Sequence, residues 1–179
     1  MPTSRPHIQL FTDGACLGNP GPGGWAYICR NPQNNDEYHD SGGERDTTNN
    51  RMELTAVIRA LESLGKIGGK VGIRKSEVGS KGPASELPTS HFPLPTFHVE
   101  LIGDSEYVLK GLTEWLPGWK KRDWRKADKK PVLNADLWKQ LDELQARHHL
   151  TITWVRGHTG HPENERCDLL AKEEAMKRA

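Results

Sequence analysis

Four acidic residues are placed where a folded chain could bring their side chains together: Asp13, Glu53, Asp104 and Asp168. Two of them end predicted strands, and ligands of open α/β sheets bind beyond the carboxyl ends of the strands. The other two lie in the first turn of a predicted helix and near the start of the last predicted helix. Converging carboxylates repel one another unless a cation compensates them, and Mg²⁺ and Mn²⁺ prefer oxygen ligands. The four acids therefore predict a divalent-metal site.

Two such ions, about 3.5–4 Å apart, would activate a water molecule and stabilise the leaving oxygen in phosphodiester cleavage. Each acid taken alone could instead be a turn former, a helix cap or a solvated surface charge. The occurrence of all four at the ends of strands and helices favours the metal site.

His158 lies between Gly157 and Gly160, which predicts a flexible loop. A histidine there can exchange protons near neutral pH, although taken alone it could be an ordinary surface residue. A zinc site of His158, His161 and Cys167 is an alternative, but the spacing matches no closed four-ligand zinc site. His161 better fits a cap of the last helix, and Cys167 a small packing residue.

A basic segment rich in tryptophan covers residues 119–131, which carry seven basic and two acidic side chains, or a net +5. Cations bind phosphates with release of counterions, and indole rings stack on sugars or bases. A solvated charged loop is the alternative, but tryptophan is an unusual residue in such a loop. The predicted nucleic-acid contacts are Trp115, Trp119, Lys120 and Lys121, whereas Trp138 and Trp154 are predicted to be core residues.

The elements that would position these residues follow from hydrophobic periodicity and turn signals. Strands are predicted over residues 7–13, 25–29, 37–43, 98–104 and 150–155, with a loop over 18–24. Helices are predicted over residues 51–64, 105–112 and 162–177, and a further helix begins at 134 or 136 and ends at 147. The helix over 105–112 has a short continuation to residue 116, and Pro117 and Gly118 are predicted to break it. The order predicts an α/β domain whose five-stranded mixed sheet, an antiparallel meander plus two parallel strands, is flanked by helices on both faces.

Length and composition favour a single domain over residues 1–179, with a surface insertion rich in glycine and proline at about 66–97 that includes a short hairpin near 70–78. No apolar run approaches the ~18 residues of a membrane span, and no signal peptide is visible. Three cysteines suit the reducing cytoplasm. The net charge of +1 divides into +5 in residues 119–131, +3 in residues 66–97 and −7 elsewhere. Because the positive and negative segments cancel in the sum, a net charge near zero does not argue against an enzyme that acts on nucleic acid.

Residues 13–24, 47–54, 103–108 and 157–168 resemble, in order, the four motif blocks of the bacterial type 1 ribonuclease H family. The resemblance covers nearly the whole chain except residues 66–97. It implies a ribonuclease H-like fold and an endonuclease that hydrolyses the RNA strand of RNA–DNA hybrids, leaving 5′-phosphate and 3′-hydroxyl ends. It also implies two Mg²⁺ ions, for which Mn²⁺ would substitute, no small-molecule cofactor, no membrane partner and a monomer.

The resemblance assigns roles to the motif residues. The four acids would hold the metal ions, with Asp13 and Asp104 nearest to both, and His158 would help proton transfer or product release. The residues expected to contact the hybrid are Asn19, Asn49 and Asn50 near the cut, and Thr48, Arg51 and Lys121 at a DNA phosphate. Glu106 departs from the pattern, since many relatives have Gln there, and its carboxylate can accept a hydrogen bond from a 2′-hydroxyl but cannot donate one.

Two alternatives stay open at this point. One is a metal nuclease of the same fold that acts on DNA, against which the asparagine-rich blocks and the basic tryptophan segment argue. The other is a non-catalytic hybrid-binding module. Four intact acids and His158 argue against that module, because clustered carboxylates weaken the binding of a polyanion unless metal is bound.

Overall fold

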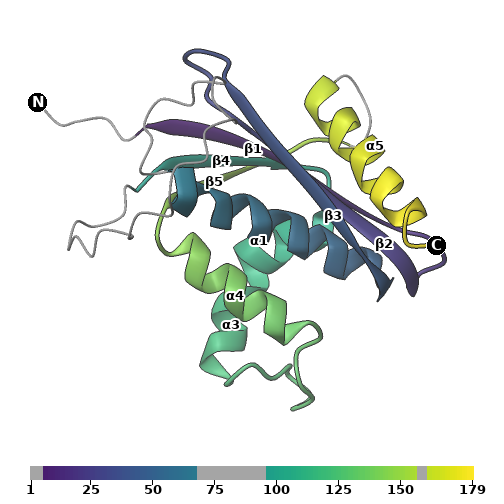
Figure 1. Ribbon diagram of the computed structural model, residues 1–179. Coiled ribbons are helices and arrows are strands. Elements are labelled where there is room, and N and C mark those ends of the chain that lie inside the picture. Colours follow the sequence, from purple (N-terminus) through teal and green to yellow (C-terminus); the bar gives the residue numbers. More distant parts are fainter. Residues whose placement is uncertain (1–5, 68–95, 157–160) are drawn as a thin grey trace, which may run out of the picture.

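The computed structural model describes residues 6–67, 96–156 and 161–179. Its five strands form one mixed sheet in the order β3-β2-β1-β4-β5 (Figure 1). The strands are β1 (His7–Cys16), β2 (Gly21–Arg30), β3 (Glu37–Thr47), β4 (His98–Gly103) and β5 (His149–Trp154). The β1–β2 and β2–β3 pairs are antiparallel, and the β1–β4 and β4–β5 pairs are parallel. This arrangement confirms the predicted meander followed by two parallel strands.

Helices cover both faces of the sheet. They are α1 (Asn49–Ile67), α2 (Glu106–Lys110), the π-helical turn η1 (Gly111–Trp115), α3 (Leu116–Lys121), α4 (Ala135–Gln145) and α5 (Pro162–Met176). Figure 1 shows α5 alone on one side of the sheet, whereas α1, α3 and α4 lie on the other side. None of the helices in these described ranges is long and apolar enough to cross a membrane.

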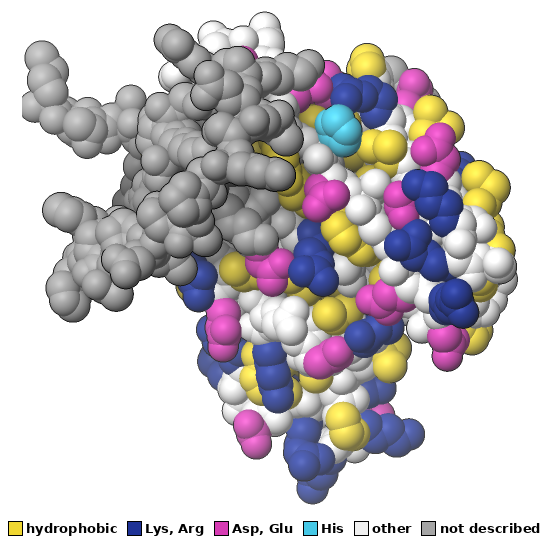
Figure 2. All heavy atoms as spheres, in the orientation of Figure 1, with side chains coloured by type: hydrophobic (Ala, Val, Ile, Leu, Met, Phe, Trp, Pro, Cys, Tyr) yellow, Lys and Arg dark blue, Asp and Glu magenta, His cyan; other side chains and the backbone are white. Residues whose placement is uncertain are grey.

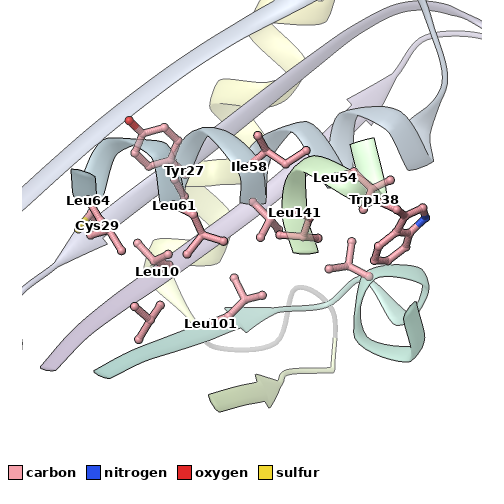
Figure 3. Packing of buried hydrophobic residues seen from close by; sticks show 14 of the residues in the cluster. Leu10, Tyr27, Cys29, Leu54, Ile58, Leu61, Leu64, Leu101, Trp138 and Leu141 are labelled. Carbon is pink, nitrogen blue, oxygen red and sulfur yellow. The ribbon is translucent and has the colours of Figure 1, made fainter. Parts of the chain in front are cut away.

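The larger core lies between the sheet and α1, where Leu10 and Leu101 of the sheet meet Leu61 of the helix (Figure 3). The apolar residues at helical spacing along α1 form its buried face, and every member is at most 1 % exposed: Ala56, Val57, Ala60, Leu61 and Leu64. Trp138 of α4 is fully buried, as predicted. Burial of a large side chain stabilises the fold by roughly 1.5–3 kcal/mol, so this layer holds α1 and α4 on the sheet.

The second core lies under α5. On the inner face of this helix Cys167, Ala171 and Ala175 are fully buried, whereas Leu170 is only partly buried. Cys167 and Ala171 pack against Phe11 of β1. Small side chains on this face let the helix axis come close to the sheet. The position of α5 relative to β1 is therefore set by contacts that leave little room for adjustment.

Strand β1 is longer than predicted and continues past Asp13 to Cys16. The glycine-rich segment predicted to be a loop over residues 18–24 is strand from Gly21 onward. Close packing explains this difference, because a Cβ atom on Gly24 would lie 2.0 Å from the carbonyl oxygen of Ala171 in α5. The glycine is thus required by the approach of a helix and does not signal a turn. Strand β3 likewise continues to Thr47, beyond the predicted end at residue 43.

The predicted helix break at Pro117 and Gly118 was wrong, because the helical path continues to Lys121. The π-helical turn immediately before it offers a physical reason. There the Leu116 N–H donates to the Gly111 carbonyl, five residues back. Pro117 follows in the first turn of α3, where a missing N–H is tolerated. The predicted basic loop therefore begins inside a helix and becomes a loop only after Lys121.

Several boundaries also differ. Helix α1 begins at Asn49 and ends at Ile67, so it takes in the first residues of the predicted insertion. Phe97, at the other end of that insertion, is a core residue with 4 % exposure. Helix α4 follows Asn134, one of the two predicted starts. The predicted hairpin at 70–78 lies outside the described residues.

The prediction that Trp154 is a core residue was wrong, because it is 43 % exposed. It is the last residue of β5, which forms an edge of the sheet and has only β4 as a neighbour. The apolar character of a tryptophan does not indicate on which side of an edge strand another element will pack.

Candidate active site

Strands β1 and β4 bring Asp13 and Asp104 together. The parallel pairing of these strands ends at Phe11 and Ile102, and Asp104 follows the last residue of β4. Asp13 lies two residues beyond the last pair, within the part of β1 that still pairs with Ala26 of β2. Both carboxylates thus extend past the end of β4, as the sequence predicted.

Glu53 approaches the same point from α1, where it lies in the second turn and not in the predicted first turn. Carboxylate oxygens of Asp13, Glu53 and Asp104 lie within 4.8 Å of one another. Gly14 makes this approach possible, because a Cβ atom there would lie 2.4 Å from the backbone nitrogen of Glu53. The helix could not rest against β1 in this way with any other residue at position 14.

Replacing Gly14 with Ala is therefore expected to destabilise the protein by about 1–3 kcal/mol, because backbone atoms of α1 have to move. Urea unfolding measures the loss. Gly65→Ala is the matched control, since the added methyl group would meet nothing within 4 Å. That change in a helix should stabilise the protein by about 0.5–1 kcal/mol. Equal effects of the two substitutions would contradict the close approach as the cause.

Asp168 of α5 reaches the same cavity, whose volume is about 300 Å³, but lies outside the tight group of three. The cavity is lined by Asp13, Gly14, Ala15, Cys16, Asn49, Glu53, Asp104, Asp168 and Lys172. Lys172 donates to Asp168 at 2.7 Å, one turn along the helix. Sequence reasoning missed Lys172, although its i,i+4 spacing from Asp168 on one helix is a signal that could have identified it.

Burial and mutual repulsion make these carboxylates unusual acids. Burial, followed by the nearby charge of Asp104, raises the pKa of Asp13 to about 7, although the Gly14 N–H donates to its Oδ1 at 2.9 Å. Burial and the charges of Asp13 and Asp104 raise the pKa of Glu53 well above its ordinary value. Asp13 and Glu53 are each only 7 % exposed, and the cluster carries excess negative charge. Such a group of oxygen donors fits a hard divalent cation.

The polar residues predicted to contact substrate surround the start of α1. Thr48 caps the helix, with its Oγ1 accepting from the Arg51 N–H at 3.3 Å. The Asn49 N–H donates to Oδ1 of Asn19 at 3.0 Å, which holds the loop before β2 against the helix. Asn50 follows in the first turn of α1 and is partly exposed. The structure thus brings these residues together beside the acids.

Arg51 is held on the α4 side of this region. Its guanidinium donates to both carboxylate oxygens of Asp136 at 3.1 and 3.0 Å, and to the Asn134 side chain at 3.2 Å. This hydrogen bonding raises the pKa of Arg51 and lowers that of Asp136. Two parallel hydrogen bonds to one carboxylate fix the orientation of the guanidinium plane of Arg51.

The predicted aromatic contacts differ in accessibility. Trp119 is only 9 % exposed and packs against Trp138 and Trp115, with ring centroids 5.3 and 5.7 Å apart. Trp115 is partly buried. Lys120 pairs with Asp142 at 3.1 Å, and Lys121 is exposed. The indole of Trp119 therefore has a structural role in the core and offers at most an edge to a ligand.

Glu106 and the basic segment lie on the surface. Glu106 is exposed in the first turn of α2 and pairs with Lys110 at 3.7 Å. Figure 2 shows Lys and Arg side chains at the lower end of the molecule, where Figure 1 places α3 and the loop that leads to α4.

The predicted loop histidine, His158, lies outside the described residues. His161 is at the N-cap position of α5, as predicted, but its side chain makes no capping hydrogen bond. Cys167 is buried and its thiol donates to the Phe11 carbonyl at 3.4 Å. Cys167 thus packs between α5 and β1, in agreement with the predicted structural role.

Comparisons with known proteins agree with this geometry. The sequence profile of the RNase H family matches residues 5–75 and 89–176. A protein named ribonuclease H from Halorhodospira halophila is 48 % identical over 97 % of this chain and 95 % of its own length. A second, from Polynucleobacter asymbioticus, is 49 % identical over 95 % of this chain and 90 % of its own length.

Solved structures show the same fold. LC9-RNase H1, described as a type 1 RNase H with the type 2 active-site motif, superposes with a TM-score of 0.73 at 27 % identity, over 100 % of this chain and 76 % of that one. LC11-RNase H1, solved in complex with an RNA/DNA hybrid, has a TM-score of 0.64 at 23 % identity, over 95 % of this chain and 97 % of that one. With the family profile matching most of its length and three acids meeting past the end of β4, the chain belongs to the RNase H family of hydrolases.

Proposed function

We propose that the protein hydrolyses the RNA strand of RNA–DNA hybrids by a two-metal-ion reaction that leaves 5′-phosphate and 3′-hydroxyl ends. The observation that carries this proposal is the group of three carboxylates from β1, α1 and the end of β4, two of them buried and one partly buried, within 4.8 Å of one another. Relatives named ribonuclease H and the hybrid bound in the LC11-RNase H1 structure support the choice of substrate.

The metal ligands in this proposal are Asp13, Glu53, Asp104 and Asp168, with Asp13 and Asp104 nearest to both ions. Mg²⁺ is the proposed ion and Mn²⁺ its substitute, because all four side chains offer oxygen atoms. The bound ions would supply an activated water and charge stabilisation at the leaving oxygen. His158 would take part in proton transfer or product release.

The remaining polar residues would hold the hybrid. Asn19, Asn49 and Asn50 would contact it near the cut, where amide groups can both donate to and accept from a 2′-hydroxyl. Glu106 would accept a hydrogen bond from a 2′-hydroxyl of the RNA strand. The residues proposed for the DNA strand and the basic surface are Thr48, Arg51, Trp115, Trp119, Lys120 and Lys121. We also propose that the protein acts as a monomer in the cytoplasm, where its free cysteines, Cys16, Cys29 and Cys167, would stay reduced.

Cleavage of five labelled substrates tests this function: RNA–DNA hybrid, double-stranded RNA, double-stranded DNA, and single strands of RNA and DNA. Each is incubated with Mg²⁺ and, separately, with EDTA. Only the RNA strand of the hybrid should be cut, and only with Mg²⁺. Cleavage of double-stranded DNA would instead identify a DNA-directed nuclease. Binding of the hybrid without cleavage would identify a binding module.

The basic segment predicts a change in the salt dependence of hybrid binding. Replacing Lys126 and Lys129 with Gln should lower the slope of log K against log salt by about 0.9 for each phosphate that the variant no longer neutralises, and raise KM. Fluorescence anisotropy at several salt concentrations measures the slope. The control variant carries Arg147→Gln and Lys177→Gln, which removes the same charge elsewhere on the surface. If both variants keep the slope of the parent protein, the basic segment does not bind phosphate.

A further inference from the structure

Lys172 is the one basic side chain among the described residues that line the cavity of the acids. The same lining contains four carboxylates, those of Asp13, Glu53, Asp104 and Asp168. The Nζ of Lys172 donates to Oδ2 of Asp168 at 2.7 Å, so the cavity holds an internal counter-ion. This hydrogen bond, followed by the charges of Asp168 and Asp13, raises the pKa of Lys172. The ammonium is therefore attracted by the central acids as well as by its own partner.

Asp168 is the acid that the tight cluster leaves out. Carboxylate oxygens of Asp13, Glu53 and Asp104 lie within 4.8 Å of one another, and Asp168 does not belong to that group. The side chain of Asp168 is 17 % exposed and that of Lys172 is 53 % exposed, so the lysine can move into solvent more easily than its partner can. The fourth acid is thus held by an ammonium group that is able to leave it.

The packing of α5 leaves the two side chains as the parts that can adjust. Cys167 and Ala171, which immediately precede Asp168 and Lys172, are fully buried in the core between α5 and the sheet. A Cβ atom on Gly24 of β2 would lie 2.0 Å from the Ala171 carbonyl oxygen, and such close packing resists displacement of the helix. Asp168 can therefore approach the other acids only by rotation of its side chain. That rotation competes with its hydrogen bond to Lys172.

We propose that Lys172 is a positioning residue that lowers the affinity of the cavity for divalent cations by holding Asp168 in an ion pair. This inference rests on the proposed function, in which Asp168 is a metal ligand. The ammonium and a divalent cation compete for one carboxylate, and their like charges repel each other. Before a metal ion binds, the same ion pair reduces the repulsion among the four carboxylates. Lys172 thus stabilises the metal-free protein and weakens metal binding.

Isothermal titration calorimetry with Mg²⁺, in the absence of nucleic acid, tests this inference on the full chain. Lys172→Gln should bind Mg²⁺ roughly twofold to fivefold more tightly than the parent protein, which is the range that a partly exposed ion pair can contribute. Lys172→Arg keeps the positive charge and the ion pair, so it should bind Mg²⁺ no more tightly than the parent protein. A residue with a structural role alone would not change the metal affinity in this direction.

Two further variants separate the ion pair from a general effect of charge. Lys177→Gln is the matched control, since Lys177 pairs with Glu174 at 2.9 Å at the end of α5 and its loss removes the same charge. This control should bind Mg²⁺ like the parent protein. In an Asp168→Asn background, Lys172→Gln should change the Mg²⁺ affinity less than it does in the parent protein, because no carboxylate is left for the lysine to hold.

The inference is overturned by itself if Lys172→Gln binds Mg²⁺ with the parent affinity or more weakly. It is also overturned if Lys177→Gln tightens Mg²⁺ binding as much as Lys172→Gln does, or if Lys172→Gln has equal effects in the parent and Asp168→Asn backgrounds. A different result points to the proposed function: if the parent protein binds no Mg²⁺, or if Asp168→Asn alone keeps the parent affinity, the proposed ligand set is wrong and this inference is overturned with it.

Discussion

Replacing Asp13 with Asn is expected to lower the rate of Mg²⁺-dependent hybrid cleavage by about 10³-fold or more. Asp13 lies within 4.8 Å of both Glu53 and Asp104, so its loss removes a charged oxygen ligand from the centre of the cluster. Charge stabilisation by bound metal ions is worth several kcal/mol, and about 1.4 kcal/mol corresponds to a tenfold change in rate. Single-turnover cleavage of labelled hybrid measures the effect.

Hybrid binding by Asp13→Asn should persist, because the amide carries no charge to repel the phosphates and the contacts of the basic segment stay in place. Asp40→Asn is the control, since Asp40 is an exposed acid on β3. The control should cut the hybrid at the rate of the parent protein. Cleavage by Asp13→Asn within about tenfold of the parent rate would exclude Asp13 as a central metal ligand.

Without metal, the same cluster should make the protein less stable as the pH rises. Burial and the charge of Asp104 raise the pKa of Asp13 from 3.8 to about 7. For an acid whose pKa is raised by folding, its contribution to stability is fully present below pH 3.8 and is lost as the pH rises to about 7. We expect the Asp13 carboxylate to cost about 1–3 kcal/mol of unfolding free energy at pH 8, and Mg²⁺ to restore much of it.

Urea unfolding at about pH 4.5 and about pH 8, in EDTA and in Mg²⁺, measures this effect. Other groups also titrate, so the informative quantity is the difference between Asp13→Asn and the parent protein. In EDTA the variant should be more stable than the parent, and the difference should grow between the two pH values. In Mg²⁺ the advantage of the variant should shrink or reverse. If, in EDTA, the difference in unfolding free energy between Asp13→Asn and the parent protein is the same at both pH values, the pKa of Asp13 is not raised by folding.

Much of the fold could be predicted from the sequence, because local patterns encode it. The helical spacing of Ala56, Val57, Ala60 and Leu61 places them on one side of the helix, and that side must face the core. The alternation through residues 7–13 and 98–104 defines two strands whose ends carry Asp13 and Asp104. Since the ends of adjacent parallel strands meet at one edge of a sheet, the meeting of these two acids was also predictable.

Other features depended on which surfaces meet in the folded chain. Trp154 is exposed because β5 is an edge strand, and Trp119 is buried because α4 brings Trp138 against it. The glycine at position 24 is required by α5, whose contact with β2 cannot be read from local turn signals. In each case the burial or the residue type is set by contact, or lack of contact, with a segment distant in the sequence.

The sequence by itself determined the order of elements, the faces that form the core and the set of acids, because these depend on residue types at short spacings. Only the tertiary structure decided the distances between those acids, the pairing of Lys172 with Asp168, and the row that His7, His98 and His149 form across β1, β4 and β5. Strand register is the physical reason for the row: it places residues from three separate segments side by side, and a shift by one residue would turn one of those histidines to the other face.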